Sequence, residues 1–289
     1  MDYLLDMDYT MLANLIKRLA RQPSAMDNKY SRGTVGFITG SEVYPGAAVL
    51  GVGAAQQTGV GLVRYVGPRR AADLVLQSHP EVIVAEHFAQ AMPAQAWVIG
   101  SGISASDDFQ AANIGNLLAE PRIAVVDAGA LDIIDFGSAS KSSLLLTPHL
   151  GELIRLLNKL TASNDFTSDR FLGMADVRDA AALAARFTGQ TVLVKGNTNV
   201  LALPLGQIIE VGPTSPHLAT AGSGDVLAGI LGGLAAANPE LADTYWLDIA
   251  TLGILLHSEA AVLAAKRGLV TASTISSGVA QIMNERLAG

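Results

Sequence analysis

The stretch HLATAGSGDVLAGILGG, residues 217–233, joins a loop of small residues to an apolar helix. Its first charged side chain, Asp225, stands at the junction, where the N–H groups of the first helical turn lack partners within the helix and carry about half a positive charge. Gly222 and Gly224, on either side of Ser223, leave these N–H groups accessible to a ligand. Two interpretations follow: Asp225 caps the helix, or an anion binds the N–H groups while the carboxylate handles a proton.

Outward from this stretch, short β-branched runs alternate with longer segments rich in Ala and Leu. The runs predict buried strands over 33–39, 61–66, 81–85, 96–100, 122–127, 143–147 and 191–195. The other segments predict helices over 46–58, 107–119, 150–160, 170–187, 224–237, 245–267 and 274–286. Residues 199–211 predict a hairpin at the sheet edge, and the glycines of 51–61 predict close helix packing. The pattern is typical of an α/β fold with a central, mostly parallel sheet and helices on both faces.

Length and composition limit the classes of protein that the chain can represent. Its 289 residues suit one large domain, so we expect a single catalytic domain over 31–289, with a helical leader of residues 1–30 packed outside it. The net charge of −7 and the lack of a basic run argue against a nucleic-acid partner. The chain has no cysteine, which excludes disulfides and Cys-ligated zinc and agrees with a cytoplasmic protein. A mean hydropathy of +0.36 predicts a homo-oligomer.

Neither a secretory signal nor a membrane span is predicted. The N-terminus opens acidic and has no apolar core followed by a cleavage site. The most apolar later run, 249–265, is interrupted by His257, Ser258 and Glu259, whereas a span needs about 20 nearly uncharged residues.

Five of the predicted strands are followed by residues suited to a binding site. The segments that follow them are GSEVYPGAA, GSGIS, DAGALD, PHLGE and GNTN. In parallel sheets, ligands bind beyond the carboxyl ends of the strands, so we expect these segments to converge on one edge. A metal site with a full set of protein ligands is not predicted, and Walker, dinucleotide-binding, HExxH and G-x-S-x-G motifs are absent from the sequence.

Several side chains in these segments have two interpretations each. Lys195 ends a buried strand, so it either meets an anion, for which phosphate is a natural candidate, or extends to the surface. His149 caps or fills a turn, or it contacts a ligand. Asp127 holds a magnesium ion or bonds a loop backbone, and Glu152 is either an acid of the first helical turn or part of the site. His79, His87 and His257 are assigned to structure.

The ordered set of segments 40–48, 125–132, 146–153, 192–200 and 217–234 resembles the ADP- or ATP-dependent NAD(P)H-hydrate dehydratases of the ribokinase-like superfamily. The resemblance covers about residues 30–287, and the fairly specific motifs are TPHLGE and LATAGSGDVLAG. It implies a three-layer sandwich and a repair reaction on the hydrated S form of NADH or NADPH. The added hydroxyl is phosphorylated at the expense of ADP or ATP, with Mg²⁺ bridging the nucleotide phosphates, and phosphate then leaves. The family also suggests a homotetramer.

Carried over by motif, the resemblance assigns two sets of site residues. The residues that would contact the hydrated dinucleotide are Ala47, Gly102, His149 and Asp225, with Asp225 as the proton acceptor. The residues that would bind the spent nucleotide are Lys195, Gly196, Asn197, Thr198, Asn199 and Gly224, and the N–H groups at 222–225, including those of Gly222 and Ser223, would hold the transferring phosphate.

Two departures from the family pattern stand out. GPTSPHLAT, residues 212–220, replaces a Gly-Asn-Pro-Gly-like run, and His217 receives no role. About 30 residues precede the first predicted strand, so we expect any fused epimerase of relatives to be a separate protein here. The competing hypotheses are a ribokinase-like kinase acting on a thiazole or pyrimidine alcohol, and a nucleotide sensor without turnover.

Overall fold

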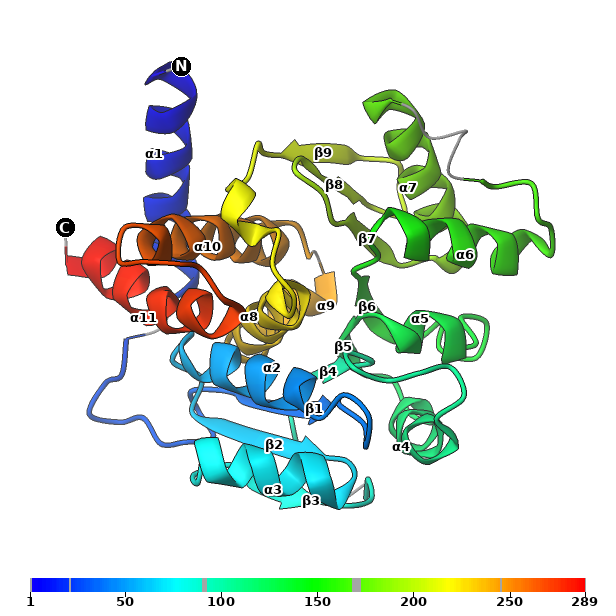
Figure 1. Cartoon of the computed structure of the whole chain (residues 1–289), viewed down its shortest axis with the longest axis horizontal. Helices are drawn as coiled ribbons and strands as arrows, with labels where there is room; N and C mark the ends of the chain where they lie inside the picture. Colours follow the sequence, from blue (N-terminus) through cyan, green and yellow to red (C-terminus); the bar gives the residue numbers. More distant parts are fainter. Residues whose placement is uncertain (1, 21, 90–92, 168–172, 245, 289) are drawn as a thin grey trace.

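A computed structural model describes the chain except for residues 1, 21, 90–92, 168–172, 245 and 289. The described residues form one sheet of nine strands in the order β3-β2-β1-β4-β5-β6-β7-β8-β9 (Figure 1). The strands are β1 (Thr34–Ile38), β2 (Leu62–Val66), β3 (Ile83–Ala85), β4 (Ala96–Ile99), β5 (Ile123–Val126), β6 (Ser143–Leu146), β7 (Thr191–Val194), β8 (Asn199–Ala202) and β9 (Ile208–Val211). The first seven pair in parallel, and β8 and β9 form an antiparallel hairpin at one edge.

Helices cover both faces of this sheet, which confirms the predicted three-layer α/β fold. One face carries α1 (Asp2–Leu19), α2 (Gly46–Gln56), α3 (Arg69–Ser78), α8 (Ser223–Ala237), α9 (Pro239–Thr244), α10 (Leu247–Ala265) and α11 (Ala272–Ala288). The other carries α4 (Asp108–Leu118), α5 (Gly129–Ile133), α6 (Leu150–Thr161) and α7 (Met174–Thr188). A 3-10 turn, η2 (Pro216–Leu218), leads into the loop before α8.

The central strands are buried on both sides because their side chains alternate between the two helical layers. In β1, Val35 and Phe37 join the core under α2 and α8, whereas Ile38 joins the core under α4. In β4, Val98 and Trp97 divide in the same way. Uniformly apolar strands are what such two-sided burial requires, which is why their positions were readable from the sequence.

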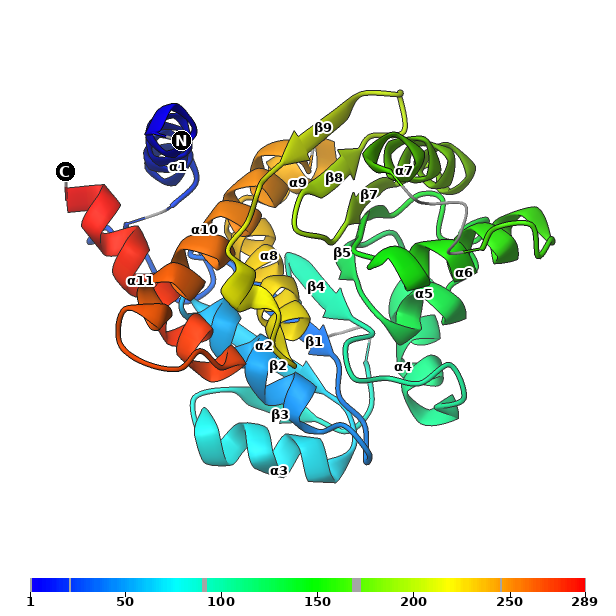
Figure 2. The same ribbon diagram turned by 45° about the horizontal axis from the view of Figure 1, so that its top comes forward.

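Glycines bring α2 and α8 into close contact, as the segment 51–61 predicted. A Cβ atom on Gly229 of α8 would lie 2.2 Å from the carbonyl oxygen of Gly51 in α2, so only glycine permits this approach. Figure 2 shows α8 alongside α2 and above β1 and β4. Because α8 packs directly on the sheet, its N-terminus is held at the level of the carboxyl ends of the strands.

The predicted helices and strands are largely confirmed, with three differences. The first is that the structure contains three short helices, α3, α5 and α9, which were not predicted. The second is that β3 is shorter than the predicted strand 81–85 because it lies at the sheet edge, where Ile83 is exposed. The third concerns the starts of two helices. The predicted starts of two helices at 170 and 245 lie outside the described residues. Those helices begin in the described part at Met174 and Leu247.

The N-terminal helix α1 and the apolar helix α10 are both part of the helical layer on one face of the sheet. Leu12, Ile16 and Leu19 of α1 are buried in the core that α10 and α11 share. Among the described residues, α10 is the helix long and apolar enough to cross a membrane by length and composition, but 67% of its most apolar window is buried inside the fold, as in the core helix of a globular protein.

Candidate active site

The carboxyl ends of the parallel strands assemble the predicted segments on one edge of the sheet. Backbone hydrogen bonds join them in sequence: Gly40 N donates to Ser101 O at 2.7 Å, and Asp127 N donates to Ile99 O at 2.9 Å. Lys195 N donates to Pro148 O at 2.8 Å, and a parallel bridge pairs His149 with Lys195. The predicted convergence of the five segments is thus confirmed.

The N-terminus of α8 faces this edge with three amides available. Gly222 precedes the helix with φ +86°, a left-handed conformation that favours glycine, and a Cβ there would also meet Leu50 Cδ1 at 2.5 Å. Among the hydrogen bonds of the described residues, none is donated by the amides of Gly222, Gly224 or Asp225, whereas Ser223 N donates to Thr220 O at 3.3 Å. Amides without partners at a helix N-terminus are suited to binding an anion.

Asp225 does not cap its own helix. The N-cap position belongs to Gly222, and Asp225 is the third residue of the helix. No hydrogen bond to the Asp225 side chain is found among the described residues, so the capping interpretation is not what the structure shows. Burial, and next the negative charge of Asp127, raise the pKa of the Asp225 carboxyl to about 6, although Lys195 acts in the opposite direction. A carboxyl of this kind is an effective proton acceptor at neutral pH because it is ionised yet more basic than a solvated one.

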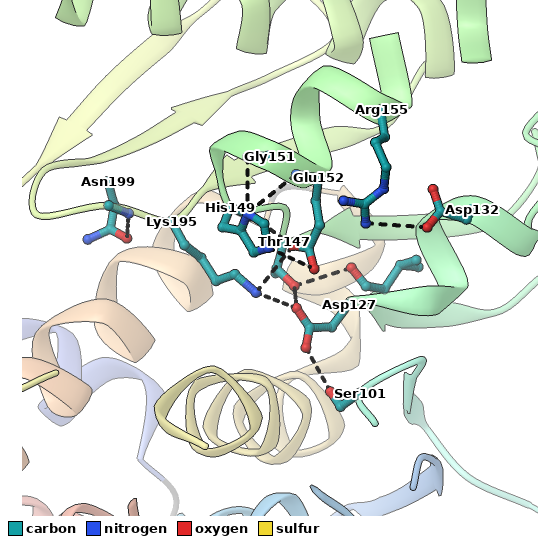
Figure 3. Close-up of polar contacts among 12 residues, drawn as sticks. Ser101, Asp127, Asp132, Thr147, His149, Gly151, Glu152, Arg155, Lys195 and Asn199 are labelled. Carbon is teal, nitrogen blue, oxygen red and sulfur yellow. Dashed lines mark hydrogen bonds and ion pairs between the residues drawn. The ribbon is translucent and has the colours of Figure 1, made fainter. Parts of the chain in front are cut away.

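Lys195 meets an anion that the chain itself supplies. Its Nζ lies 2.5 Å from Asp127 Oδ1 and 4.0 Å from Glu152 Oε2 (Figure 3). Burial opposes its charge, but the carboxylates of Asp127, Glu152 and Asp225 outweigh burial and raise its pKa. Of the two interpretations of Lys195, the structure supports the one with an anion partner, because the side chain is only 18% exposed and lies inside this cluster.

Asp127 accepts side-chain hydrogen bonds rather than the predicted loop backbone bond. Ser101 Oγ donates to its Oδ2 at 2.8 Å, and Thr147 Oγ1 donates to its Oδ1 at 2.9 Å. With the Lys195 ammonium group, these donors satisfy both carboxylate oxygens of a residue that is 3% exposed. Among the described residues, no group of three or more His, Asp or Glu could hold a metal ion, so the interpretation of Asp127 as a magnesium ligand gains no support from neighbouring donors.

His149 begins α6 as its N-cap. Its Nδ1 accepts hydrogen bonds from Gly151 N at 3.0 Å and Glu152 N at 3.3 Å, while Glu152 Oε2 accepts from His149 N at 2.9 Å. This reciprocal arrangement is a capping box, so the structural interpretation of both residues holds. The imidazole nevertheless borders the same cavity as Lys195, which leaves it within reach of a ligand.

A cavity of about 430 Å³ opens beside the α8 N-terminus, between the β7–β8 turn and the loop before α8. Of the residues predicted to bind nucleotide, those that line it are Lys195, Gly196, Asn197, Asn199, Ser223 and Gly224. Thr198 and Gly222 are not among its lining residues. The Asn199 side chain braces the turn, because its Oδ1 accepts from Gly196 N at 3.4 Å.

The other two residues predicted to contact the dinucleotide meet on the opposite side of α8. A Cβ atom on Gly102 would lie 2.5 Å from Ala47 Cβ and 2.9 Å from Tyr44 O, so the loops after β1 and β4 touch there. Leu50, one turn after Ala47 in α2, lies against Gly222. The α8 N-terminus therefore stands between the cavity and the Ala47–Gly102 contact.

Sequence reasoning missed three residues at this edge. Ser101 and Thr147, which bind Asp127, directly follow β4 and β6, so the rule that sites form at strand ends could have found them. His257 was assigned to structure, yet it lines the cavity and its Nε2 has no partner among the described residues. Burial lowers the pKa of His257 to about 4, which keeps it neutral at physiological pH.

Comparison with solved structures identifies the fold class of the chain. A dehydratase from Bacillus subtilis, described as ADP/ATP-dependent NAD(P)H-hydrate dehydratase, matches with a TM-score of 0.76 and 20% identity, over 95% of this chain and 97% of that one. A hydroxyethylthiazole kinase from Pyrococcus horikoshii matches with a TM-score of 0.62 and 16% identity, over 96% of both chains. The chain therefore has the ribokinase-like fold.

The sequence comparisons identify the family within that class. The family model described as NAD(P)H-hydrate dehydratase matches residues 35–281, so the chain belongs to the NAD(P)H-hydrate dehydratase family. An ADP-dependent (S)-NAD(P)H-hydrate dehydratase from Neisseria meningitidis is 30% identical over 88% of this chain and 84% of its own. The bifunctional NAD(P)H-hydrate repair enzyme Nnr of Mycobacterium tuberculosis is 38% identical over 75% of this chain but 43% of its own length, so the chain spans less than half of such relatives.

Proposed function

We propose that the chain dehydrates the S form of hydrated NADH or NADPH, using ADP, or ATP, as the phosphoryl donor. The observation that carries the proposal is the uncapped Asp225 carboxyl beside free amides at the α8 N-terminus. The activity for which the Neisseria relative is named supports both the substrate and ADP, and the Bacillus structure was obtained with ATP and Mg²⁺. With ADP, the products are AMP, phosphate and the intact dinucleotide.

The geometry divides the reaction between two groups of residues. Asp225 takes the proton of the hydroxyl that hydration added, while the hydroxyl oxygen forms a bond to the terminal phosphorus of the nucleotide. The bridging P–O bond of the nucleotide breaks in this step, and AMP leaves when ADP is the donor. The amides of Gly222, Gly224 and Asp225 donate hydrogen bonds to the charge that grows on the transferring phosphoryl group. Phosphate then leaves with the C–O bonding electrons, a proton is lost from the ring, and the double bond is restored.

The cavity of about 430 Å³ is the proposed site of the spent nucleotide, with Lys195, Gly196, Asn197 and Asn199 at its phosphate side and His149 at its border. Thr198 is proposed to contribute from the same turn, although its side chain does not line the cavity. Ala47, Gly102 and Asp225 are proposed to contact the hydrated dinucleotide on the other side of the phosphoryl group. Mg²⁺ would neutralise nucleotide phosphates when bound. The chain offers it no three-ligand protein site among the described residues, so its ligands would come mainly from the phosphates.

The remaining proposals concern the setting of the enzyme. We propose a homotetramer in the cytoplasm, on the excess of apolar residues and the lack of cysteine. The division into a leader of residues 1–30 and one catalytic domain of 31–289 is likewise a proposal. Neither nucleic acid nor a membrane is a proposed partner.

Absorbance of the reduced nicotinamide tests the reaction directly. Purified protein is incubated with hydrated NADH and hydrated NADPH, each with ADP, ATP or no nucleotide. We expect recovery of absorbance with ADP and hydrate together, accompanied by AMP. Recovery without nucleotide would contradict phosphoryl transfer. AMP binding without recovery on either hydrate would support a sensor, and phosphorylation of a thiazole or pyrimidine alcohol instead would support the kinase of the same fold.

The raised pKa of Asp225 predicts an acid limb in the rate profile. Burial and Asp127 raise this pKa to about 6, so the carboxyl is increasingly protonated below pH 6 and cannot accept the hydroxyl proton. We expect kcat/KM to fall about tenfold for each pH unit well below pH 6, and to be independent of this group above about pH 7. Steady-state kcat/KM between pH 4.5 and 8 measures it, and a limb centred near pH 4 would show that Asp225 is not perturbed.

A further inference from the structure

Asp127 is a buried carboxylate for which the proposed reaction has no direct use. It stands at the end of β5, 3% exposed, with one oxygen bound by Ser101 and the other by Thr147 and Lys195. Burial of a carboxylate is costly unless hydrogen-bond donors and a cation offset its loss of hydration. Lys195 is the cation that it contacts.

The Lys195 ammonium group lies near the carboxylates of Asp127, Glu152 and Asp225. It lies close to the α8 N-terminus, where a Cβ on Gly224 would be 3.7 Å from its Nζ. Asp225 is near enough to act on its charge, yet the contact of 2.5 Å is with Asp127. An ammonium group paired with Asp225 instead would stabilise the carboxylate and make it a weaker base.

We propose that Asp127 is a positioning residue that anchors the Lys195 ammonium group beside the glycine loop and keeps it from neutralising the Asp225 base. Asp127 touches neither substrate nor nucleotide in this proposal; it acts through Lys195 and through its own charge. The catalytic part of the statement rests on the proposed function, whereas the choice of partner by Lys195 does not.

Among the charged groups near Asp225, Asp127 and Lys195 are the ones that set the pKa of its carboxyl. On α6, Glu152 lies 4.0 Å from Lys195 Nζ and is tied to the His149 capping box. On α10, His257 is neutral because burial lowers its pKa to about 4. The adjacent helix α2, Gly46–Gln56, carries no charged residue. Asp127 is the second cause, after burial, of the raised pKa of Asp225.

Asp127→Asn tests the proposal because it removes the anchor and keeps the shape. We expect the acid limb of kcat/KM to move down by about one pH unit, because Lys195 turns to Asp225. A base that is weaker by about one pKa unit should lower kcat/KM at pH 7.5 by about threefold, with about tenfold as the upper limit. Carbon-13 NMR titration of the Asp225 carboxyl should show the same downward shift without any substrate. Ser101→Ala is the matched control: it removes one hydrogen bond but no charge, so the Asp225 titration should stay where it is in wild type.

The outcomes separate the two proposals. If the wild type turns over neither hydrate, the proposed function fails, and the NMR titration still decides the role of Asp127. An Asp225 titration that is the same in Asp127→Asn and wild type would overturn the inference. Should Asp127→Asn not fold, the wild type supplies the answer: scalar coupling across the hydrogen bond from Lys195 Nζ to the Asp127 carboxyl carbon is expected, and coupling to the Asp225 carboxyl instead would refute it.

Discussion

Asp225→Asn should lower kcat for dehydration by about 10²–10⁴-fold while AMP affinity stays within about threefold of wild type. Asparagine keeps the size of the side chain and cannot accept the hydroxyl proton. The amides beside it are unchanged, because the wild-type carboxyl does not bind them. Stopped assays of AMP formation and calorimetry of AMP binding measure the two quantities separately.

Stability distinguishes this loss from unfolding. The pKa of Asp225 is raised in the folded chain, chiefly by burial, so the charged form is disfavoured there and stability is lost as pH rises from about 4 to about 6. Asn removes that penalty, and the melting temperature at pH 7 should be no lower than that of wild type. Asp73→Asn, an exposed acid-to-amide change in α3, is the matched control and should retain full kcat. Wild-type turnover by Asp225→Asn would rule out its role as the base.

Lys195→Met should both destabilise the fold and weaken nucleotide binding. It leaves the Asp127 carboxylate, 4% exposed in its side chain, without its cation, a loss of the kind that costs about 3 kcal/mol or more. A charge-assisted hydrogen bond to phosphate would also be lost, which corresponds to about a 10- to 100-fold weaker affinity for ADP and AMP. Urea unfolding and calorimetry measure the two effects.

A second substitution separates the structural part from the binding part. In the Lys195→Met/Asp127→Asn double variant, the uncompensated charge is gone, so most of the stability should return, whereas nucleotide affinity should stay low. Lys159→Met is the control: this lysine donates to the carbonyl oxygens of Asp132 and Ile134, away from the cavity, so its loss should cost stability without changing affinity. Unchanged stability in Lys195→Met would show that the ion pair does not hold Asp127.

Much of the fold was predictable because strands that are buried on both faces of a sheet have a simple sequence pattern. Strands such as Ala96–Ile99 are short and uniformly apolar, and their parallel order forces the segments after them onto one edge. Helix α5, five residues long, was missed because it lies within the DAGALD loop and shows no full helical period. Helix α3 was missed as a short, polar, surface segment.

The side-chain partners at the site could not be read from the sequence in the same way. The same sequence motif fits Asp225 either as a helix cap or as a base. The structure distinguishes the two roles, because Gly222 occupies the N-cap position and the Asp225 carboxyl is free. Lys195 and Asp127 are 68 positions apart, and their contact depends on the alignment of β5, β6 and β7. The need of Lys195 for an anion was predicted, but the anion proved to be a carboxylate of the chain.

A crystal structure with AMP tests the central claim most directly, namely that free amides at the α8 N-terminus bind phosphate while Asp225 remains available as a base. We expect the AMP phosphate beside Lys195, directed toward the amides of Gly222 and Gly224, with the Asp225 carboxyl facing the Ala47–Gly102 side. AMP bound elsewhere, with the Asp225 carboxyl turned back to accept hydrogen bonds from those same amides, would contradict the account.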